Sequence, residues 1–136
     1  CALCVMHMQG EPRTMQAEPH YADVVAEVTA FLVERIHAAE AHGIARARLC
    51  IDPGFGFGKT LAHNVALSAP AALAPVLVGV SRKAMLGALT GRPVEQRQAA
   101  SVAAALLAAQ AGAAILRVHD VGATVDALKI RHALGD

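Results

Sequence analysis

Residues 49–59 read LCIDPGFGFGK, a short apolar run that leads directly into a loop with alternating glycines. The apolar run is typical of a buried strand, and the glycines indicate a loop whose backbone can curl closely around a ligand. Apolar runs at residues 3–6, 76–80 and 114–118 also lead into loops of unusual polar content. A helical stretch follows each loop. This alternation predicts a parallel sheet covered by helices.

The expected helices are either amphipathic or rich in alanine. The first spans residues 21–42 and ends at Gly43. Its apolar face comprises Val24, Val28, Phe31, Leu32 and Ile36. Further helices are expected near residues 64–73, 83–89, 95–111 and 124–134. Pro70 weakens the helix at 64–73, because proline removes a backbone donor.

The spacing of strands and helices fits consecutive βα units. A closed barrel of eight such units requires about 250 residues, and this chain has 136. We therefore expect an α/β fold of about four βα units with parallel strands, in one domain covering 1–136. Three interpretations stay open: a half-barrel, a small open sheet, or a barrel fragment without its amino-terminal half.

Composition excludes several classes of protein. Hydrophobic residues make up 55% of the chain and charged residues 17%, so a long disordered segment is not expected. The formal net charge of +1 gives no basic footprint for nucleic acid or an anionic membrane. The stretch between Arg97 and Arg117 contains no charged residue, and it is long enough to span a bilayer. Because Gly112 interrupts this stretch, we expect a buried helix followed by a strand.

The cysteines indicate a reducing compartment. They number three, at Cys1, Cys4 and Cys50, and the first residues show no basic segment of a signal peptide. We therefore expect reduced thiols in a cytoplasmic protein. Cys1 and Cys4 have metal-ligand spacing, but no second pair completes a tetrahedral site. We expect no metal site made by this chain.

Polar side chains follow each predicted strand. They are His7 and Gln9, Asp52, Ser81 and Lys83, and Arg117 and His119. The carboxyl ends of parallel strands meet at one edge of a sheet, where α/β proteins place their ligand sites. We expect these side chains to surround a common site.

Asp52 and its glycine-rich loop suggest recognition of a flat heterocycle. An ionised carboxylate can accept two parallel hydrogen bonds from an amidine-like ligand edge. The alternative is that Asp52 only forms a turn beside Pro53. The ending Gly58-Lys59-Thr60 resembles a nucleotide-binding P-loop. However, Pro53 occupies the position where that motif requires its first glycine, so ATP or GTP binding is not expected.

Two further clusters carry positive charge. Arg117 and His119 are two residues apart on a strand, so they share a face and could clamp a diphosphate. The alternative is an ion pair of Arg117 with Asp120 or Asp126. Residues 81–83 could bind an anion or polar ring oxygens. Alternatively, Ser81 only caps the following helix.

Four strings of this sequence resemble dihydropteroate synthase, the pterin-binding enzyme family of folate biosynthesis. They are residues 5–10 (VMHMQG), 52–59 (DPGFGFGK), 79–83 (GVSRK) and 117–120 (RVHD), in the family's order. The resemblance implies the carboxyl-terminal half of a TIM-type (β/α)8 barrel. It also implies a transferase that condenses (7,8-dihydropterin-6-yl)methyl diphosphate with 4-aminobenzoate, releasing diphosphate and 7,8-dihydropteroate. The site and partner assignments below come from this resemblance.

The resemblance implies a role for each matching residue. Lys83, Arg117 and His119 would be catalytic. Asp52 would hold the 2-amino and ring N–H edge of the pterin, and Lys83 its oxo group and a ring nitrogen. Arg117 would pack on the pterin and, with His119, bind the diphosphate. The remaining substrate-binding residues would be Met6 and Gly79 at the pocket, and Phe57 and Ser81 beside 4-aminobenzoate or a sulfonamide.

The family also implies Mg²⁺ and a homodimer formed through the last helices. Its magnesium-linked Asn lies in the half that these 136 residues do not match, so no magnesium ligand can be named. We expect this chain to be inactive, or nearly so, by itself. Two other interpretations stay open: the pterin-binding module of a corrinoid methyltransferase, and a non-catalytic half-barrel that binds a partner through residues 95–111.

Overall fold

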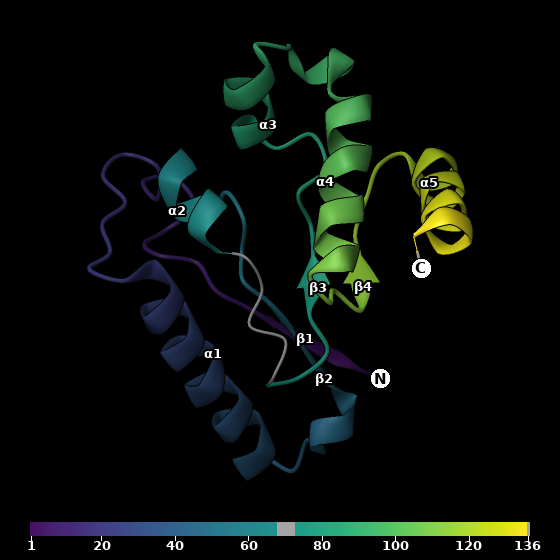
Figure 1. Ribbon diagram of the computed structural model, residues 1–136. Helices are drawn as coiled ribbons and strands as arrows, with labels where there is room; N and C mark the ends of the chain where they lie inside the picture. The colour runs from purple at the N-terminus through teal and green to yellow at the C-terminus, as the bar shows by residue number, and fades with distance from the viewer. Residues whose placement is uncertain (68–72, 136) are drawn as a thin grey trace.

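Parallel strands lie at the centre of the structure, a computed structural model that describes residues 1–67 and 73–135 (Figure 1). The strands in these ranges are β1 (Leu3–Met6), β2 (Leu49–Asp52), β3 (Leu77–Val78) and β4 (Ile115–Leu116). β1 pairs with β2, and β3 with β4. A parallel bridge between Ile51 and Val76 joins the two pairs. The strands therefore follow one another in sequence order, as successive βα units require.

Helices alternate with these strands. They are α1 (Val24–Ala41), α2 (Leu61–Ala66), α3 (Ala84–Thr90), α4 (Gln98–Gln110) and α5 (Val121–Leu134). Short 3₁₀ turns at Arg46–Arg48 and Val94–Gln96 precede β2 and α4. Helix α1 packs against β1, whereas α4 packs against β4 and α5 (Figure 1). The predicted α/β fold with parallel strands is confirmed.

The amino-acid sequence fixes both ends of α1. The carboxylate of Asp23 accepts hydrogen bonds from the backbone N–H groups of Val25 and Ala26, both at 3.0 Å. The carboxylate of Glu27 accepts a hydrogen bond from the backbone N–H of Asp23 at 3.1 Å. These bonds satisfy N–H groups that have no partner inside the helix. The helix thus begins at Val24 rather than at Tyr21, and Gly43 follows its end with φ +81°.

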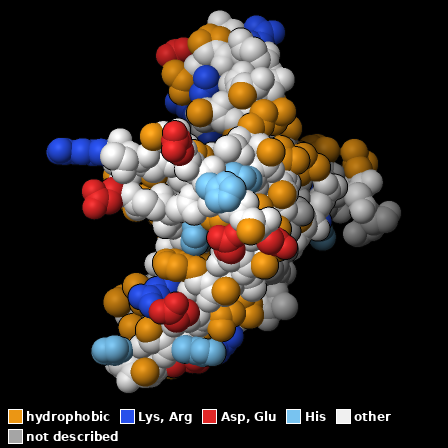
Figure 2. All heavy atoms as spheres, turned by 90° about the vertical axis from the view of Figure 1, so that its left-hand side faces the viewer, with side chains coloured by type: hydrophobic (Ala, Val, Ile, Leu, Met, Phe, Trp, Pro, Cys, Tyr) orange, Lys and Arg blue, Asp and Glu red, His pale blue; other side chains and the backbone are white. Residues whose placement is uncertain are grey.

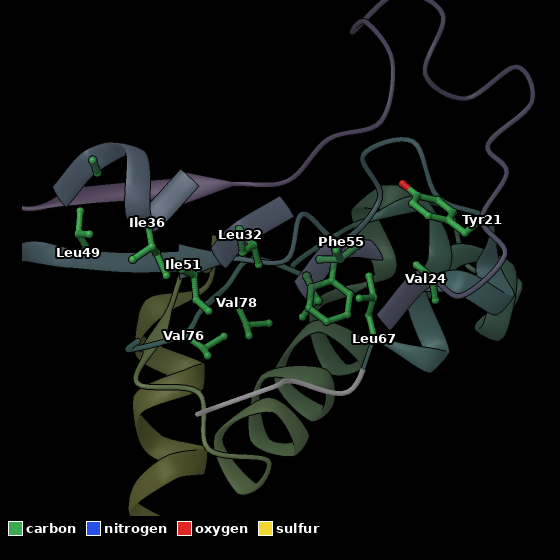
Figure 3. Packing of buried hydrophobic residues seen from close by; sticks show 13 residues of the cluster. Tyr21, Val24, Leu32, Ile36, Leu49, Ile51, Phe55, Leu67, Val76 and Val78 are labelled. Atoms are coloured by element: carbon green, nitrogen blue, oxygen red, sulfur yellow. The ribbon is translucent and has the colours of Figure 1, made fainter. Parts of the chain in front are cut away.

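Helix α1 contributes the largest apolar face to the core. Val28, Leu32 and Ile36 are fully buried, at the spacing of four residues that aligns side chains along one face. They pack with Ile51 of β2, Val76 and Val78 at β3, Phe55 in the loop after β2, and Leu67 just after α2 (Figure 3). Burying each such side chain stabilises the fold by roughly 1.5–3 kcal/mol. Phe31, predicted on the same face, is only half-buried.

Two predicted strands are shorter than their apolar runs. The runs at 76–80 and 114–118 form regular ladders only at Leu77–Val78 and Ile115–Leu116. Beyond β4, the N–H of Arg117 still donates to the carbonyl of Val78 at 2.9 Å. After Val78 the chain turns at Gly79 into the loop that holds Ser81. The apolar runs therefore predicted buried residues here, but they did not predict the residue at which the ladder of backbone hydrogen bonds ends.

The helix predicted at 64–73 begins earlier. Thr60 accepts from the backbone N–H of His63, and the ring of His63 accepts from the N–H of Thr60, both at 3.2 Å. This capping box starts α2 at Leu61, and the helix ends after Ala66. The rest of the predicted helix, with Pro70, falls largely on 68–72, outside the described residues. The last two helices also differ, because α4 begins at Gln98 and α5 at Val121.

The uncharged stretch before Arg117 divides into α4 and β4. Within 1–67 and 73–135, no helix has the length and hydropathy needed to cross a bilayer. All three cysteines are free. On the face seen in Figure 2, acidic and basic side chains are interspersed with hydrophobic ones.

Candidate functional site

Asp52 ends β2 and is buried, with 3% of its surface exposed. Its Oδ1 accepts a hydrogen bond from the N–H of Gly54 at 2.8 Å. Its Oδ2 faces the Nη2 of Arg117 at 3.4 Å. The turn beside Pro53 therefore uses one carboxylate oxygen and leaves the other directed toward the rim. Met6 is the register partner of Asp52 on β1, so these two side chains share a face of the sheet.

Arg117 reaches Asp52 across the intervening strand. It follows β4, and its guanidinium passes directly over Gly79, which follows β3. A Cβ at Gly79 would lie 2.8 Å from Nη2 and 3.0 Å from Nε of Arg117. Gly79 therefore leaves the space in which the guanidinium lies. The alternative interpretation, a pairing of Arg117 with Asp120 or Asp126, is wrong, because those carboxylates pair with Arg82 and Lys129.

Lys83 brings a second cation to the same rim. Its Nζ lies 3.9 Å from the centre of the Phe57 ring, a cation–π contact. Burial lowers the pKa of Lys83, and the positive charge of Arg117 lowers it further, whereas Asp52 raises it. Lys83 thus lies within the electrostatic field of both Asp52 and Arg117. A flat ligand at this rim would meet an acceptor, two cationic donors and an aromatic face.

Ser81 and His119 form the other side of the rim. The Oγ of Ser81 lies 2.9 Å from Nδ1 of His119 and accepts from the backbone N–H of His119 at 3.3 Å. Ser81 does not cap helix α3, because Lys83 occupies that position and provides no side-chain cap. The predicted alternative for Ser81 is therefore wrong.

These side chains converge on a hollow of about 270 Å³. It is lined by Gly79, Ser81, Lys83, Arg117, Val118 and His119. A larger hollow of about 650 Å³ lies between β4, α4 and α5. Its lining is apolar except for Arg117, Thr124 and Arg131. The smaller hollow therefore has the higher density of hydrogen-bonding groups, and it adjoins Asp52 through Arg117.

A buried lysine supports the loop after β2. Lys59 is 3% exposed, and its Nζ lies 2.9 Å from Nδ1 of His7. It also donates to the carbonyls of Gly54 and Phe57, both at 3.0 Å. The ammonium therefore binds the loop's carbonyls from inside. A P-loop instead directs backbone N–H groups toward a phosphate, so Lys59 has a different part here.

The sequence alone indicates no role for Lys59. Burial lowers the pKa of Lys59 to about 8, with Asp52 acting in the opposite direction. Burial, followed by the charge of Lys59, lowers the pKa of His7 to about 4. A neutral His7 can accept from the Lys59 ammonium, which agrees with both shifts. One feature of the sequence could have indicated this role: Lys59 lies at the end of a loop whose carbonyls need a donor. The sequence does not show, however, in which direction the Lys59 side chain points.

The side chains at the rim are not suitable ligands for Mg²⁺. Magnesium prefers a cluster of oxygen ligands, whereas Asp52 and Asp120 each face an arginine. Across the part of the chain that the structure describes, no group of three or more His, Cys, Asp or Glu residues could hold a metal ion.

Fold and site together define a class: a parallel α/β protein whose strand ends bring a carboxylate, two cationic side chains and an aromatic ring to one rim. Residues 1–119 match the family model described as pterin binding enzyme. The chain belongs to this family.

Individual proteins that this chain resembles include several dihydropteroate synthases. The chain is 51% identical over 136 residues to a dihydropteroate synthase of Haemophilus influenzae, covering 96% of this chain and 50% of that protein. It superposes on a dihydropteroate synthase of Stenotrophomonas maltophilia with TM-score 0.94 and 59% identity, covering 98% of this chain and 53% of the other. A Xanthomonas albilineans dihydropteroate synthase in complex with 7,8-dihydropteroate gives TM-score 0.88 and 57% identity, with coverage of 98% and 50%. The chain spans about half the length of the curated relatives it matches.

Proposed function

We propose that this chain is about half of a dihydropteroate synthase, supplying the last four βα units of a (β/α)8 barrel. The enzyme would join (7,8-dihydropterin-6-yl)methyl diphosphate to 4-aminobenzoate. One observation carries the proposal: Asp52, Lys83 and Arg117, from three different strand ends, meet at one rim. The relatives named above support the same reaction, and the product seen in the Xanthomonas complex contains both substrate parts.

Each rim residue has a part in binding that its chemistry allows. The Oδ2 of Asp52, which faces Arg117, accepts from the 2-amino and ring N–H edge of the pterin, and Lys83 donates to the pterin oxo group. Met6 lines this pocket. Arg117 packs on the pterin and, with His119, binds the diphosphate. Phe57 and Ser81 border the 4-aminobenzoate ring, where a sulfonamide would compete.

The reaction then needs little covalent help from the protein. The bond between the pterin methylene carbon and the diphosphate oxygen breaks, and its electron pair leaves with diphosphate. The arylamine nitrogen bonds to the methylene carbon and loses a proton. Arg117 and His119 stabilise the negative charge that develops on the leaving group, and the rim holds both reactants in line.

Asp52→Asn tests this assignment. The experiment requires a full-length synthase in which these 136 residues replace the matching half of a relative's chain, here called the completed enzyme. An amide keeps the shape but presents a donor where the pterin edge also donates. We expect pterin-diphosphate affinity, measured by calorimetry, to fall roughly 100-fold, since the charge-assisted hydrogen bonds to the carboxylate are lost. Unchanged affinity would contradict the role of Asp52.

Diphosphate competition separates this function from that of a corrinoid methyltransferase module. The proposed synthase binds diphosphate through Arg117 and His119, so free diphosphate should compete with the pterin diphosphate. The methyltransferase has no need for that clamp. Competition that persists in Arg117→Ala would contradict the assignment.

We propose that this 136-residue chain is active only together with the other half of the enzyme. The outer strand β1 carries exposed Leu3 and Cys4, and β4 carries exposed Ile115. The other half of the relative's length has no counterpart in this chain. The other half supplies the remaining strands and the magnesium ligand. The purified 136-residue chain should form no dihydropteroate, whereas the completed enzyme should. Turnover by the chain alone would contradict this proposal.

We further propose a cytoplasmic homodimer formed through α4 and α5. Leu107, Ile130 and Leu134 are exposed there and line a hollow of about 610 Å³ between the two helices. Exposed apolar surface of this kind is typical of an interface. Light scattering of the completed enzyme should give a dimer, and Ile130→Glu should shift it to a monomer. An unchanged mass for this variant would exclude the α4–α5 face.

A further inference from the structure

Arg82 has a backbone conformation that is rare for its residue type. It lies between the site residues Ser81 and Lys83, and its φ is +58°. Every other positive φ in the described ranges belongs to glycine. A residue with a Cβ is strained in this left-handed region and stays there only when its surroundings impose it. The surroundings of Arg82 supply three such restraints.

The first restraint acts on the backbone N–H of Arg82. This group donates to the Oγ of Ser101 on α4 at 2.9 Å. Ser101 is 2% exposed, and its hydroxyl donates in turn to the carbonyl of Arg97 at 2.6 Å. Since the Ser101 hydroxyl donates in one direction and accepts in the other, its orientation is fixed. It therefore holds the Arg82 backbone against the first turn of α4.

The second restraint is the side chain of Arg82. Its Nη2 donates to both carboxylate oxygens of Asp120, at 3.0 and 3.2 Å. Asp120 immediately follows His119, and its carbonyl accepts from the N–H and the hydroxyl of Thr124 in α5. The ion pair therefore ties the loop after β3 to the loop after β4, next to the contact between Ser81 and His119.

The third restraint is Arg97. Its Nη1 donates to the carbonyls of Arg82 and Lys83, at 3.2 and 3.4 Å. The guanidinium occupies the space over Gly87 on α3, where any Cβ would overlap it. The peptide groups on both sides of the strained residue are thus held by Ser101 of α4 and by Arg97, the residue just before that helix.

We propose that the Arg82–Asp120 ion pair is a positioning element for this site, and that it deepens the proposed function by setting the 4-aminobenzoate subsite. The strained turn at Arg82 directs Ser81 toward His119, and Lys83 toward Phe57. If φ at Arg82 relaxed to a negative value, the chain on either side would rotate and separate these two pairs. Arg82 and Asp120 then act through Ser81 and Lys83, without touching substrate.

Comparing alanine with glycine at position 82 tests the proposal in the completed enzyme. Both variants lose the ion pair, but Arg82→Ala keeps the strain, whereas Arg82→Gly tolerates a positive φ. We expect Arg82→Ala to raise KM for 4-aminobenzoate roughly 10- to 100-fold, the range for a displaced positioning contact. Arg82→Gly should recover much of that loss. The affinity for pterin diphosphate should weaken in Arg82→Ala and recover in Arg82→Gly as well, because Lys83 and His119 also bind that substrate.

Equal losses in the two variants would overturn the proposal, because a guanidinium that contacts substrate directly makes alanine and glycine equivalent. Asp120→Asn should match Arg82→Ala, and the double variant should be no worse than either single one. Additive losses would likewise overturn the coupling. Asp126→Asn, which breaks the exposed pair with Lys129, is the matched control and should leave KM unchanged.

A readout without turnover separates this proposal from the proposed function. Lys83 is half-buried, whereas Lys129 is exposed. Reductive methylation followed by peptide mass spectrometry gives the labelling rate of each lysine. We expect Lys83 to label at least threefold faster in Arg82→Ala and Asp120→Asn, with Arg82→Gly closer to wild type and Lys129 constant. Unchanged Lys83 labelling overturns the positioning role, and a completed enzyme that makes no dihydropteroate contradicts only the proposed function.

Discussion

The guanidinium of Arg117 lies 3.4 Å from the carboxylate of Asp52, although Arg117 follows β4 and Asp52 ends β2, with β3 between them. The contact is unequal, because Asp52 is buried and more than half of the Arg117 side chain is exposed. The role of this contact is positional, since it holds the Arg117 guanidinium over the Asp52 carboxylate, which we assign to the pterin.

Replacing Gly79 with alanine should disturb this placement without disturbing the core. The new Cβ would lie 2.8 Å from Nη2 of Arg117, a flexible end that can move away. We expect the guanidinium to leave Asp52 and pterin-diphosphate affinity to fall about tenfold, as for the loss of one contact of about 1.4 kcal/mol. Calorimetry on the completed enzyme measures this change.

Gly122→Ala is the matched control for that variant. Gly122 lies in the first turn of α5, and a Cβ there meets nothing within 4 Å. Affinity should stay unchanged, and stability should rise by at most about 1 kcal/mol because alanine favours a helix. If Gly79→Ala bound as tightly as Gly122→Ala, the position of Arg117 over β3 would not matter for binding.

The sequence predicted the alternation of strands and helices because buried parallel strands appear as uninterrupted apolar runs. It also predicted which residues follow the strands, and topology brings those residues to one edge. Strand ends were predicted poorly, as at residues 76–80, because hydrogen bonds to a neighbouring strand decide them. The start of α2 depends on the capping box of Thr60 and His63, which the pattern of apolar residues does not reveal.

Side-chain direction was the main property that the sequence could not predict. Arg117 had nearby carboxylates at Asp120 and Asp126, yet it pairs with Asp52, which is 65 residues away. Lys59 turns inward to its own loop, although most lysines remain in solvent. Both outcomes depend on how the loops pack in three dimensions, so no local pattern contained them.

Lys59→Met should loosen the loop that carries Asp52. The variant keeps the length of the side chain but removes the donor to His7, Gly54 and Phe57. Buried acceptors without a donor cost about 1–3 kcal/mol, a loss only partly offset by no longer burying a charge. Urea denaturation of the completed enzyme should show this loss. Lys129→Met, at an exposed position, should change stability by less than about 0.5 kcal/mol, and equal effects of the two variants would contradict the role of Lys59.

His7 should make the fold sensitive to mild acid. Its pKa is about 4 in the folded protein and 6.5 in the unfolded chain, so between these values the unfolded chain binds one more proton. Stability should therefore fall as pH drops from 6.5 to 4, by up to about 1.4 kcal/mol per pH unit. Urea midpoints of the completed enzyme measured across this range give the slope. His7→Gln, which cannot titrate, should have a shallower slope, and an identical slope would show that another group is responsible.

Lys83 should give substrate binding an alkaline limit. Burial lowers its pKa below the ordinary value of 10.5, so the ammonium loses its proton at a pH where most lysines remain charged. Pterin-diphosphate affinity should weaken as pH rises through this lowered pKa, because a charged donor becomes a neutral amine. Calorimetry from pH 7 to 10 on the completed enzyme measures the decline. Lys83→Arg keeps its charge throughout this range, so its affinity, whatever its starting value, should decline less. Because any titration of the pterin itself affects both proteins alike, parallel curves would show that Lys83 does not donate its charge to the ligand.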